Sequence, residues 1–268
     1  MSNGAAPSPP QRRNFSVTKT VAEATGFVLN NIRLLARIGA VPFAVETAGL
    51  LRALWAERAH ESYLSEMWAI LYLIAIVPYQ TQIQRYVLGL VPISERPALF
   101  PWDMRETRFL LHAVGLFLVA AVLSFCSLIP FAIYGWLYSG SLSFHITGLA
   151  AVPGVLALAA SLVYAGYIFA RLQIVLPATA IGTTARWSVA WRLSRGNSGK
   201  MLLTYVVLFI YWILMLIACS ATTAFFPLDS VGEIIAAGLC VSIVTLIFIA
   251  LCAASTAIMF RVLSETEI

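Results

Sequence analysis

Polar side chains interrupt the longest apolar stretches of the chain at a few positions, and these side chains are the best placed to do chemistry. Glu46 lies beside Thr47 in the first apolar stretch, and Gln80 and Gln84 lie four residues apart in the second. A spacing of four places two side chains on one face of a helix. An ionisable group at mid-membrane costs about 2.5 kcal/mol or more, which makes it a functional candidate by default. Glu46, Gln80 and Gln84 therefore predict a polar path for a small solute, while a protonated carboxyl and hydrogen bonds between packed helices explain the same residues without one.

Three arginines recur near the ends of alternate apolar stretches, in "IQRYVLGLVP", "FARLQIVLP" and "MFRVLSE". They are Arg85, Arg171 and Arg261, and mainly apolar residues separate the first two from Pro92 and Pro177. We therefore expect these arginines a turn or more before their helices end, where a guanidinium group can form forked hydrogen bonds with phosphate. The pattern predicts a site for anionic lipid headgroups. Pairing with helix-end carbonyls or nearby carboxylates is the alternative.

The residues of common enzyme and metal sites do not gather in this sequence. No Ser-His-Asp set, glycine-rich phosphate loop or helix-borne His-Glu pair is present. His112 has no carboxylate, cysteine or second histidine at ligand spacing, and His60 and His145 are isolated too. The four cysteines lie in apolar runs without paired spacing, so we expect packing residues and neither a disulfide framework nor a zinc site. We predict no catalytic residue, no metal and no cofactor.

The composition sets the class of protein. Of 268 residues, 60% are apolar and 11% are charged, against about 25% charged in a soluble domain, and the mean hydropathy is +0.87. The net charge of +5 does not indicate a nucleic-acid partner, because the cations are not clustered with a stacking platform on a soluble domain. We expect a disordered tail at 1–16, one transmembrane domain at 17–263 and a short tail at 264–268. Membrane lipid is the expected partner.

Six segments are apolar over the roughly 20 residues that a helix needs to cross a membrane. Their expected bounds are Leu34–Leu54, Met67–Leu88, Phe109–Ile133, Leu149–Leu172, Met201–Phe226 and Ile234–Val262. All six are too long for strands, and their Leu, Ala and Gly content suits helices that pack closely in lipid. The expected fold is all-α, a polytopic membrane protein with six transmembrane helices.

Lysine and arginine are divided unequally between the two sides of this arrangement. Fifteen of the 17 lysines and arginines fall on one side of the membrane: before the first segment, in the second and fourth connectors, or near the segment ends on that side. Arg52 and Arg58 fall on the other side. Short loops rich in lysine and arginine stay in the cytoplasm. We therefore expect a multi-pass protein of the bacterial inner membrane with both termini cytoplasmic.

An interfacial segment is expected before each odd-numbered span. The stretch 17–28 carries apolar residues along one helical face, "ERPALFPWDMRETR" offers helix starts at Pro97 and Pro101, and "ARWSVAWRL" reads as a short amphipathic helix. The expected interfacial anchors are Trp102, Trp187 and Trp191.

The spacing of the three arginines indicates a repeat. Arg85, Arg171 and Arg261 are separated by 86 and 90 residues. A period of this size fits three units, each an interfacial helix followed by a helical hairpin.

Two adjacent stretches carry a family resemblance, "RLQIVLPATAIG" at 171–182 and "ARWSVAWRLSRGNSGKMLL" at 185–203. In their order of arginine, proline, tryptophan and Arg-Gly-Asn elements they resemble the membrane domain that precedes the catalytic domain of some glycerophosphodiester phosphodiesterases, and related stand-alone bacterial inner-membrane proteins. The resemblance covers about 35 residues closely and the six-span layout loosely. Because the sequence has no phosphodiesterase catalytic domain, the resemblance implies topology and no activity.

Two functions are compatible with the sequence. The first is a non-enzymatic scaffold or auxiliary subunit whose basic cytoplasmic face contacts anionic membrane lipid or a membrane-protein partner. The second is a small-solute permease with its site near Glu46 and the glutamines of the second span. Three units in parallel orientation favour the first, since transporters commonly use inverted repeats or paired bundles.

Overall fold

The computed structural model describes residues 15–59, 65–92, 101–139, 152–183, 186–223 and 231–264. Every regular element in these ranges is an α-helix, which confirms the all-α prediction for this part of the chain. The helices are α1 (Val17–Asn30), α2 (Ile32–Ile38), α3 (Ala40–Ala59), α4 (Ser65–Val87), α5 (Met104–Ser139), α6 (Val152–Leu172), α7 (Val175–Ala180), α8 (Trp187–Leu193), α9 (Ser198–Thr223) and α10 (Val231–Ser264).

Four stretches of these helices are long and apolar enough to cross a membrane. They are Met104–Cys126, Val155–Ala180, Ser198–Ala221 and Ile235–Ser264. The bent pair formed by α2 and the part of α3 up to Arg52 adds a fifth if it makes one span. The described residues thus contain four to five candidate spans, which indicates a multi-pass membrane protein. The number of six spans stays a prediction.

α1 forms because its sequence has a capping residue at the start and apolar side chains along one face. The Ser16 hydroxyl accepts a hydrogen bond from the backbone N–H of Lys19 at 3.5 Å, as an N-cap does. Val21, Ala24 and Val28 are buried in an apolar cluster with residues of α4, α9 and α10. The helix and the buried face predicted for 17–28 are confirmed.

The first predicted span is divided by a bend of 61° at Gly39, between α2 and α3. A Cβ on Gly39 would lie 3.2 Å from the ring of Tyr79, so a larger residue would push α4 away. Pro42 lies in the first turn of α3, where its missing N–H leaves no helical bond unmade. The predicted span from Leu34 therefore contains a bend, because residues 32–38 form the separate helix α2, and its start stays a prediction.

α5 begins with a capping box in which aspartate takes the N-cap position. The N–H of Asp103 donates to Glu106 Oε2 at 3.0 Å, and Asp103 Oδ1 accepts from the N–H of Arg105 at 2.5 Å. The side-chain hydrogen bond with Glu106 lowers the pKa of Asp103. The backbone at Pro101 is not helical, so the helix start expected there is wrong, and Pro97 lies outside the described residues.

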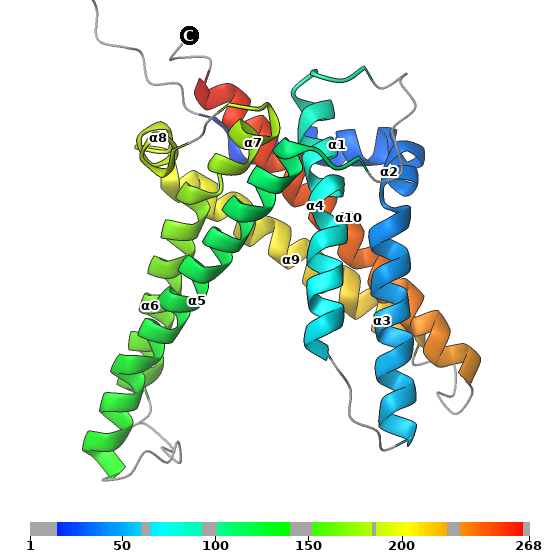
Figure 1. Cartoon of the computed structure of the whole chain (residues 1–268). Coiled ribbons are helices and arrows are strands. Elements are labelled where there is room, and N and C mark those ends of the chain that lie inside the picture. Colours follow the sequence, from blue (N-terminus) through cyan, green and yellow to red (C-terminus); the bar gives the residue numbers. More distant parts are fainter. Residues whose placement is uncertain are drawn as a thin grey trace, which may run out of the picture.

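Figure 1 shows two arms that diverge from one end where many helices meet. α3, α4 and α10 form one arm, the α5–α6 hairpin forms the other, and α9 crosses obliquely between them. α1, α2, α7 and α8 are spread across the end of the molecule from which the arms diverge, which we call the junction end (Figure 1). Apolar clusters hold this end together. One cluster, around Met201 and Met259, includes residues of each helix from α5 through α10. Another joins α4, α5 and α7 around Phe109.

α9 and α10 are also linked covalently. A disulfide joins Cys219 to Cys240, and closer to the junction end the hydroxyls of Tyr205 and Thr256 lie 2.7 Å apart. The other two cysteines are free thiols. The expectation that all four cysteines only pack is wrong for this pair, because two positions 21 residues apart meet when α9 and α10 lie side by side.

Candidate functional site

Arg171, near the end of α6, is buried and its guanidinium group binds α8. Nε donates to Ser194 Oγ at 3.0 Å, and a terminal nitrogen donates to the carbonyl oxygen of Trp191 at 2.5 Å. The guanidinium carbon also lies 3.5 Å from the centroid of the Trp191 ring, a cation–π contact. Arg171 is 7% exposed. These contacts match the alternative interpretation of this arginine, pairing with helix-end carbonyls, and its predicted lipid contact stays a prediction.

Arg261, near the end of α10, has a weaker protein partner. A terminal nitrogen lies 3.2 Å from a carboxylate oxygen of Glu23 on α1, and both side chains are more than a third exposed. Lys19 lies 3.9 Å from the other carboxylate oxygen of Glu23. An exposed ion pair contributes only about 0–1 kcal/mol, so a lipid phosphate can compete with Glu23 for Arg261.

Arg85, in the last turn of α4, differs from both. Its Nε is buried and has no hydrogen-bond partner among the described residues, and the same holds for Oε1 of the neighbouring Gln84. A buried donor left unpaired costs about 1–3 kcal/mol. Of the three arginines, Arg85 is therefore the one whose side chain has a donor still to be satisfied.

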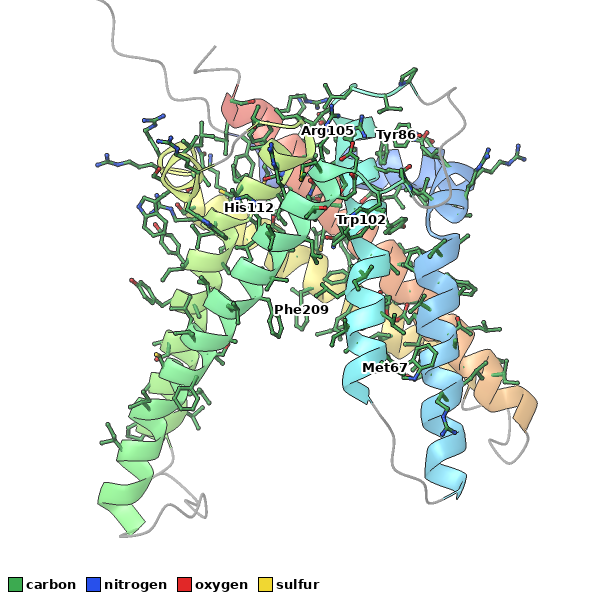
Figure 2. All side chains as sticks on the ribbon, in the orientation of Figure 1. Met67, Tyr86, Trp102, Arg105, His112 and Phe209 are labelled. Atoms are coloured by element: carbon green, nitrogen blue, oxygen red, sulfur yellow. A yellow bond between two sulfur atoms is a disulfide. The ribbon has the colours of Figure 1, made fainter. Side chains whose placement is uncertain are left out.

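Exposed arginines surround the junction end. They lie on α2, at the start of α5 and around α8, and we call them the arginine collar: Arg33, Arg37, Arg105, Arg108, Arg186, Arg192 and Arg195. Figure 2 shows blue nitrogen tips around this end, with Arg105 labelled among them. A surface with this excess of cations attracts anionic groups over about one Debye length.

The three predicted interfacial tryptophans lie at the junction end in different surroundings. Trp102 is 38% exposed and Trp191 is 42% exposed, so both keep ring surface available to the membrane interface. Trp187 instead packs on α5, where its ring lies 3.1 Å from the position that a Cβ of Gly115 would take and 5.6 Å from the His112 ring. Trp187 therefore anchors α8 to protein.

Glu46 lies where α3, α4 and α10 pack together. The Tyr72 hydroxyl on α4 lies close enough to its carboxyl group for a weak hydrogen bond of poor geometry. One turn further along α3, Leu50 lies 3.9 Å from the position that a Cβ of Gly238 on α10 would take. Because these helices are antiparallel, Ser242 lies at about the level of Glu46 (Figure 1). Buried oxygens that lack a hydrogen bond of standard geometry to any described residue occur on Glu46, Thr47, Tyr72 and Ser242.

These four side chains, which we call the Glu46 polar group, could hold a small polar molecule. Each unpaired buried oxygen costs about 1–3 kcal/mol, and a guest that donates and accepts hydrogen bonds recovers part of that cost. A carboxyl group and three hydroxyls supply both kinds of atom. A water molecule or a small hydrogen-bonding solute fits this chemistry.

Gln80 and Gln84 do not join this group. They follow Val77 by three and seven residues, which places them on its side of α4, and Val77 packs against α5 and α7. Tyr72 packs in the cluster shared with α10 instead. Their helical positions thus lie closer to Val77 than to Tyr72, and the polar path from Glu46 to the two glutamines stays a prediction.

Two features of the junction end were missed from the sequence. The Asp103–Glu106 capping box has a local signal, an aspartate three residues before a glutamate at the start of an apolar run, which could have been found. The bond from Arg171 to Ser194 has none, because the two residues are 23 positions apart and meet only when α8 docks on α6.

The fold and these sites define a multi-pass helical membrane protein with a basic junction end. Comparison with known protein families, with characterised proteins and with solved structures finds no match for this chain. The resemblance to the membrane domain of some phosphodiesterases stays a prediction, and function is argued from the geometry.

Proposed function

We propose that the chain is a non-enzymatic integral membrane protein, a scaffold or auxiliary subunit, whose arginine collar contacts anionic lipid headgroups on the cytoplasmic side of a bacterial inner membrane. The collar is the observation that carries this proposal, since seven exposed arginines share one end with the exposed rings of Trp102 and Trp191. A cation near an anionic leaflet contributes about 1 kcal/mol to binding. An acidic surface on a membrane-protein partner is the other ligand that such a collar suits.

The proposed protein has six spans, which are the four apolar helices, the bent pair of α2 and α3, and α4. Composition alone does not identify α4 as a span. α4 has 23 residues, and at about 1.5 Å per residue it is long enough for hydrocarbon about 30 Å thick. Its polar residues Thr81, Gln82 and Gln84 are buried in protein, where they do not meet lipid.

Contacts between helices support three units. Arg171 ends the second unit and binds α8, which begins the third. Arg261 ends the third unit and pairs with Glu23 on α1, which begins the first. In both cases the arginine of one unit holds the interfacial helix of another, and both contacts lie at the junction end. The positive-inside rule then orients the collar toward the cytoplasm.

A small-solute permease is the second candidate, and the unpaired oxygens of the Glu46 polar group favour it. A thermal-stability screen of small polar solutes tests this function, because a ligand that binds only the folded state raises the unfolding temperature by mass action. A solute that stabilises the wild type and not Glu46→Gln would support a permease. Stabilisation of both proteins alike would locate the binding elsewhere.

Native mass spectrometry tests the lipid role directly. We expect the triple variant Arg186→Gln, Arg192→Gln, Arg195→Gln to retain less phosphatidylglycerol than the wild type, and Arg85→Ala to retain less again when combined with it. Arg52→Gln, an exposed arginine on α3 away from the collar, removes one charge and serves as the control. Unchanged phosphatidylglycerol retention in all collar variants would contradict the proposal.

A further inference from the structure

An apolar groove opens where α1, α2, α3, α4 and α10 meet. Its volume is about 420 Å³, within the roughly 300–1,000 Å³ of typical small-molecule sites. Ile32 and Ala36 of α2, Phe43 of α3 and Ile247 of α10 are among its lining residues. The hydroxyl of Tyr79, which also lines it, donates to the carbonyl oxygen of Leu246 at 3.3 Å, so its wall presents mainly carbon.

The groove exists because of the bend at Gly39. The 61° turn carries α2 away from the axis of α3 and leaves an angle between them, and Gly39 itself lines the space. Phe43 lies along α3 and Ile243 and Ile247 lie along α10, so the groove runs from the interfacial helix α2 toward the hydrocarbon. Its shape suits an elongated apolar chain that enters from the headgroup level.

Two collar arginines stand beside the mouth. Ile32 and Ala36 line the groove, and Arg33 and Arg37 each come next in sequence, about 100° further around α2. Both arginines are exposed, and Ile32 beside them is 52% exposed. The rim of the groove is thus apolar on one side and cationic on the other. This is the charge arrangement that an anionic lipid requires, with phosphate on the arginines and hydrocarbon within.

We propose that the groove holds one acyl chain of an anionic glycerophospholipid whose phosphate binds Arg33 and Arg37. This inference rests on the proposed lipid contact of the collar and names one specific site within it. A transmembrane segment of another protein satisfies the apolar groove but leaves the two arginines without an anion. In a zwitterionic lipid the choline cation offsets the charge of the phosphate, so its headgroup pairs less favourably with two arginines.

Photo-cross-linking with an acyl-chain diazirine analogue of phosphatidylglycerol tests this site, with the matching phosphatidylcholine analogue as the comparison. After irradiation of the full chain in nanodiscs, we expect lipid adducts on peptides that contain Phe43 and Ile243–Ile247. Adducts of the phosphatidylcholine analogue there should be about tenfold fewer, because that headgroup carries no net negative charge.

Two variants and two matched controls make the test specific. Ala36→Phe fills the groove and Arg33→Gln with Arg37→Gln removes the phosphate site, and each should reduce the groove adducts about tenfold or more. Ala160→Phe places the same ring on an exposed position of α6, and Arg52→Gln removes an exposed charge on α3 outside the collar; both should leave the groove adducts unchanged. The double arginine variant alters only exposed side chains, so it remains informative if Ala36→Phe fails to fold.

Several outcomes overturn the site. Equal groove labelling by both lipid analogues, or groove adducts that survive Arg33→Gln with Arg37→Gln, would remove the headgroup contact. A second protein chain that co-purifies with the wild type and is lost from Ala36→Phe, with no lipid adducts in the groove, would assign it to another occupant. If the collar variants change phosphatidylglycerol retention while the groove yields no adducts, this site fails and the proposed function stands. If neither changes, both fail.

Discussion

The contact of Arg171 with α8 gives the most quantitative prediction. α8 has only seven residues, too few for a stable isolated helix, so it depends on its docking to the rest of the protein. Arg171 supplies two hydrogen bonds from a charged donor and a cation–π contact to that docking. Arg171→Gln removes the charge and the fork, and α8 should open more often.

The size of the effect follows from these contacts. A hydrogen bond from a charged group contributes about 1.5–3 kcal/mol, and a cation–π contact adds about 0.5–2 kcal/mol. The lower limits together give about 3.5 kcal/mol, and each 1.4 kcal/mol is a factor of ten. Amides of α8, such as those of Ala190 and Ser194, should therefore exchange with deuterium about 300-fold faster in Arg171→Gln.

Hydrogen exchange with mass spectrometry in detergent or nanodiscs is the assay. Arg195→Gln removes a charge from the same segment at an exposed position and is the matched control, with exchange in α8 expected to match the wild type. Arg171→Lys keeps the charge without the fork and should lie between the two. Wild-type exchange rates for α8 in Arg171→Gln would refute the reasoning, because docking would then not depend on the guanidinium contacts.

Three further predictions concern the topology, the Glu46 polar group and the disulfide. In a variant without native cysteines, a cysteine replacing Gly232 should react with an impermeant thiol reagent in intact cells, whereas one replacing Ser188 should not; the opposite pattern would contradict the orientation. Glu46→Leu should raise the unfolding temperature by about 2–4 °C, since it removes a buried carboxyl with an unpaired oxygen, and a lower temperature would mean that Glu46 has a stabilising partner. Alkylation of the unreduced, denatured protein should modify two cysteines and leave Cys219 and Cys240 protected until reduction, and four modified cysteines would contradict the disulfide.

The helices of this protein could be predicted from the sequence because their apolar segments are long. The buried face of α1 also followed from its spacing, since Val21, Ala24 and Val28 recur with the helical period. The bend at Gly39 could not be predicted in this way, because the apolar run continues across it. At the bend, a Cβ on Gly39 would lie 3.2 Å from the Tyr79 ring, a close approach between positions 40 residues apart that no local pattern specifies.

The candidate site was harder to predict from the sequence than the fold. The reason is again that it depends on contacts between positions far apart in the chain. Arginines could be recognised as unusual in apolar segments, but the acceptors of Arg171 lie on a separate helix whose docking no local pattern specifies. Gln80 and Gln84 share a face, as their spacing predicts. Which neighbour that face meets depends on the packing of α4, whose Val77 contacts α5 and α7.

The association of spin-labelled lipids with the protein in mixed vesicles is the most direct test of the central claim, that the collar contacts anionic lipid. The fraction of motionally restricted label is measured for phosphatidylglycerol and phosphatidylcholine, near 0.1 M salt and near 1 M salt, where the Debye length is about 10 Å and about 3 Å. We predict an excess of restricted phosphatidylglycerol at low salt that falls at high salt and is lost when the seven collar arginines are replaced by glutamine. Equal restriction of the two lipids by the wild type at low salt would contradict the account.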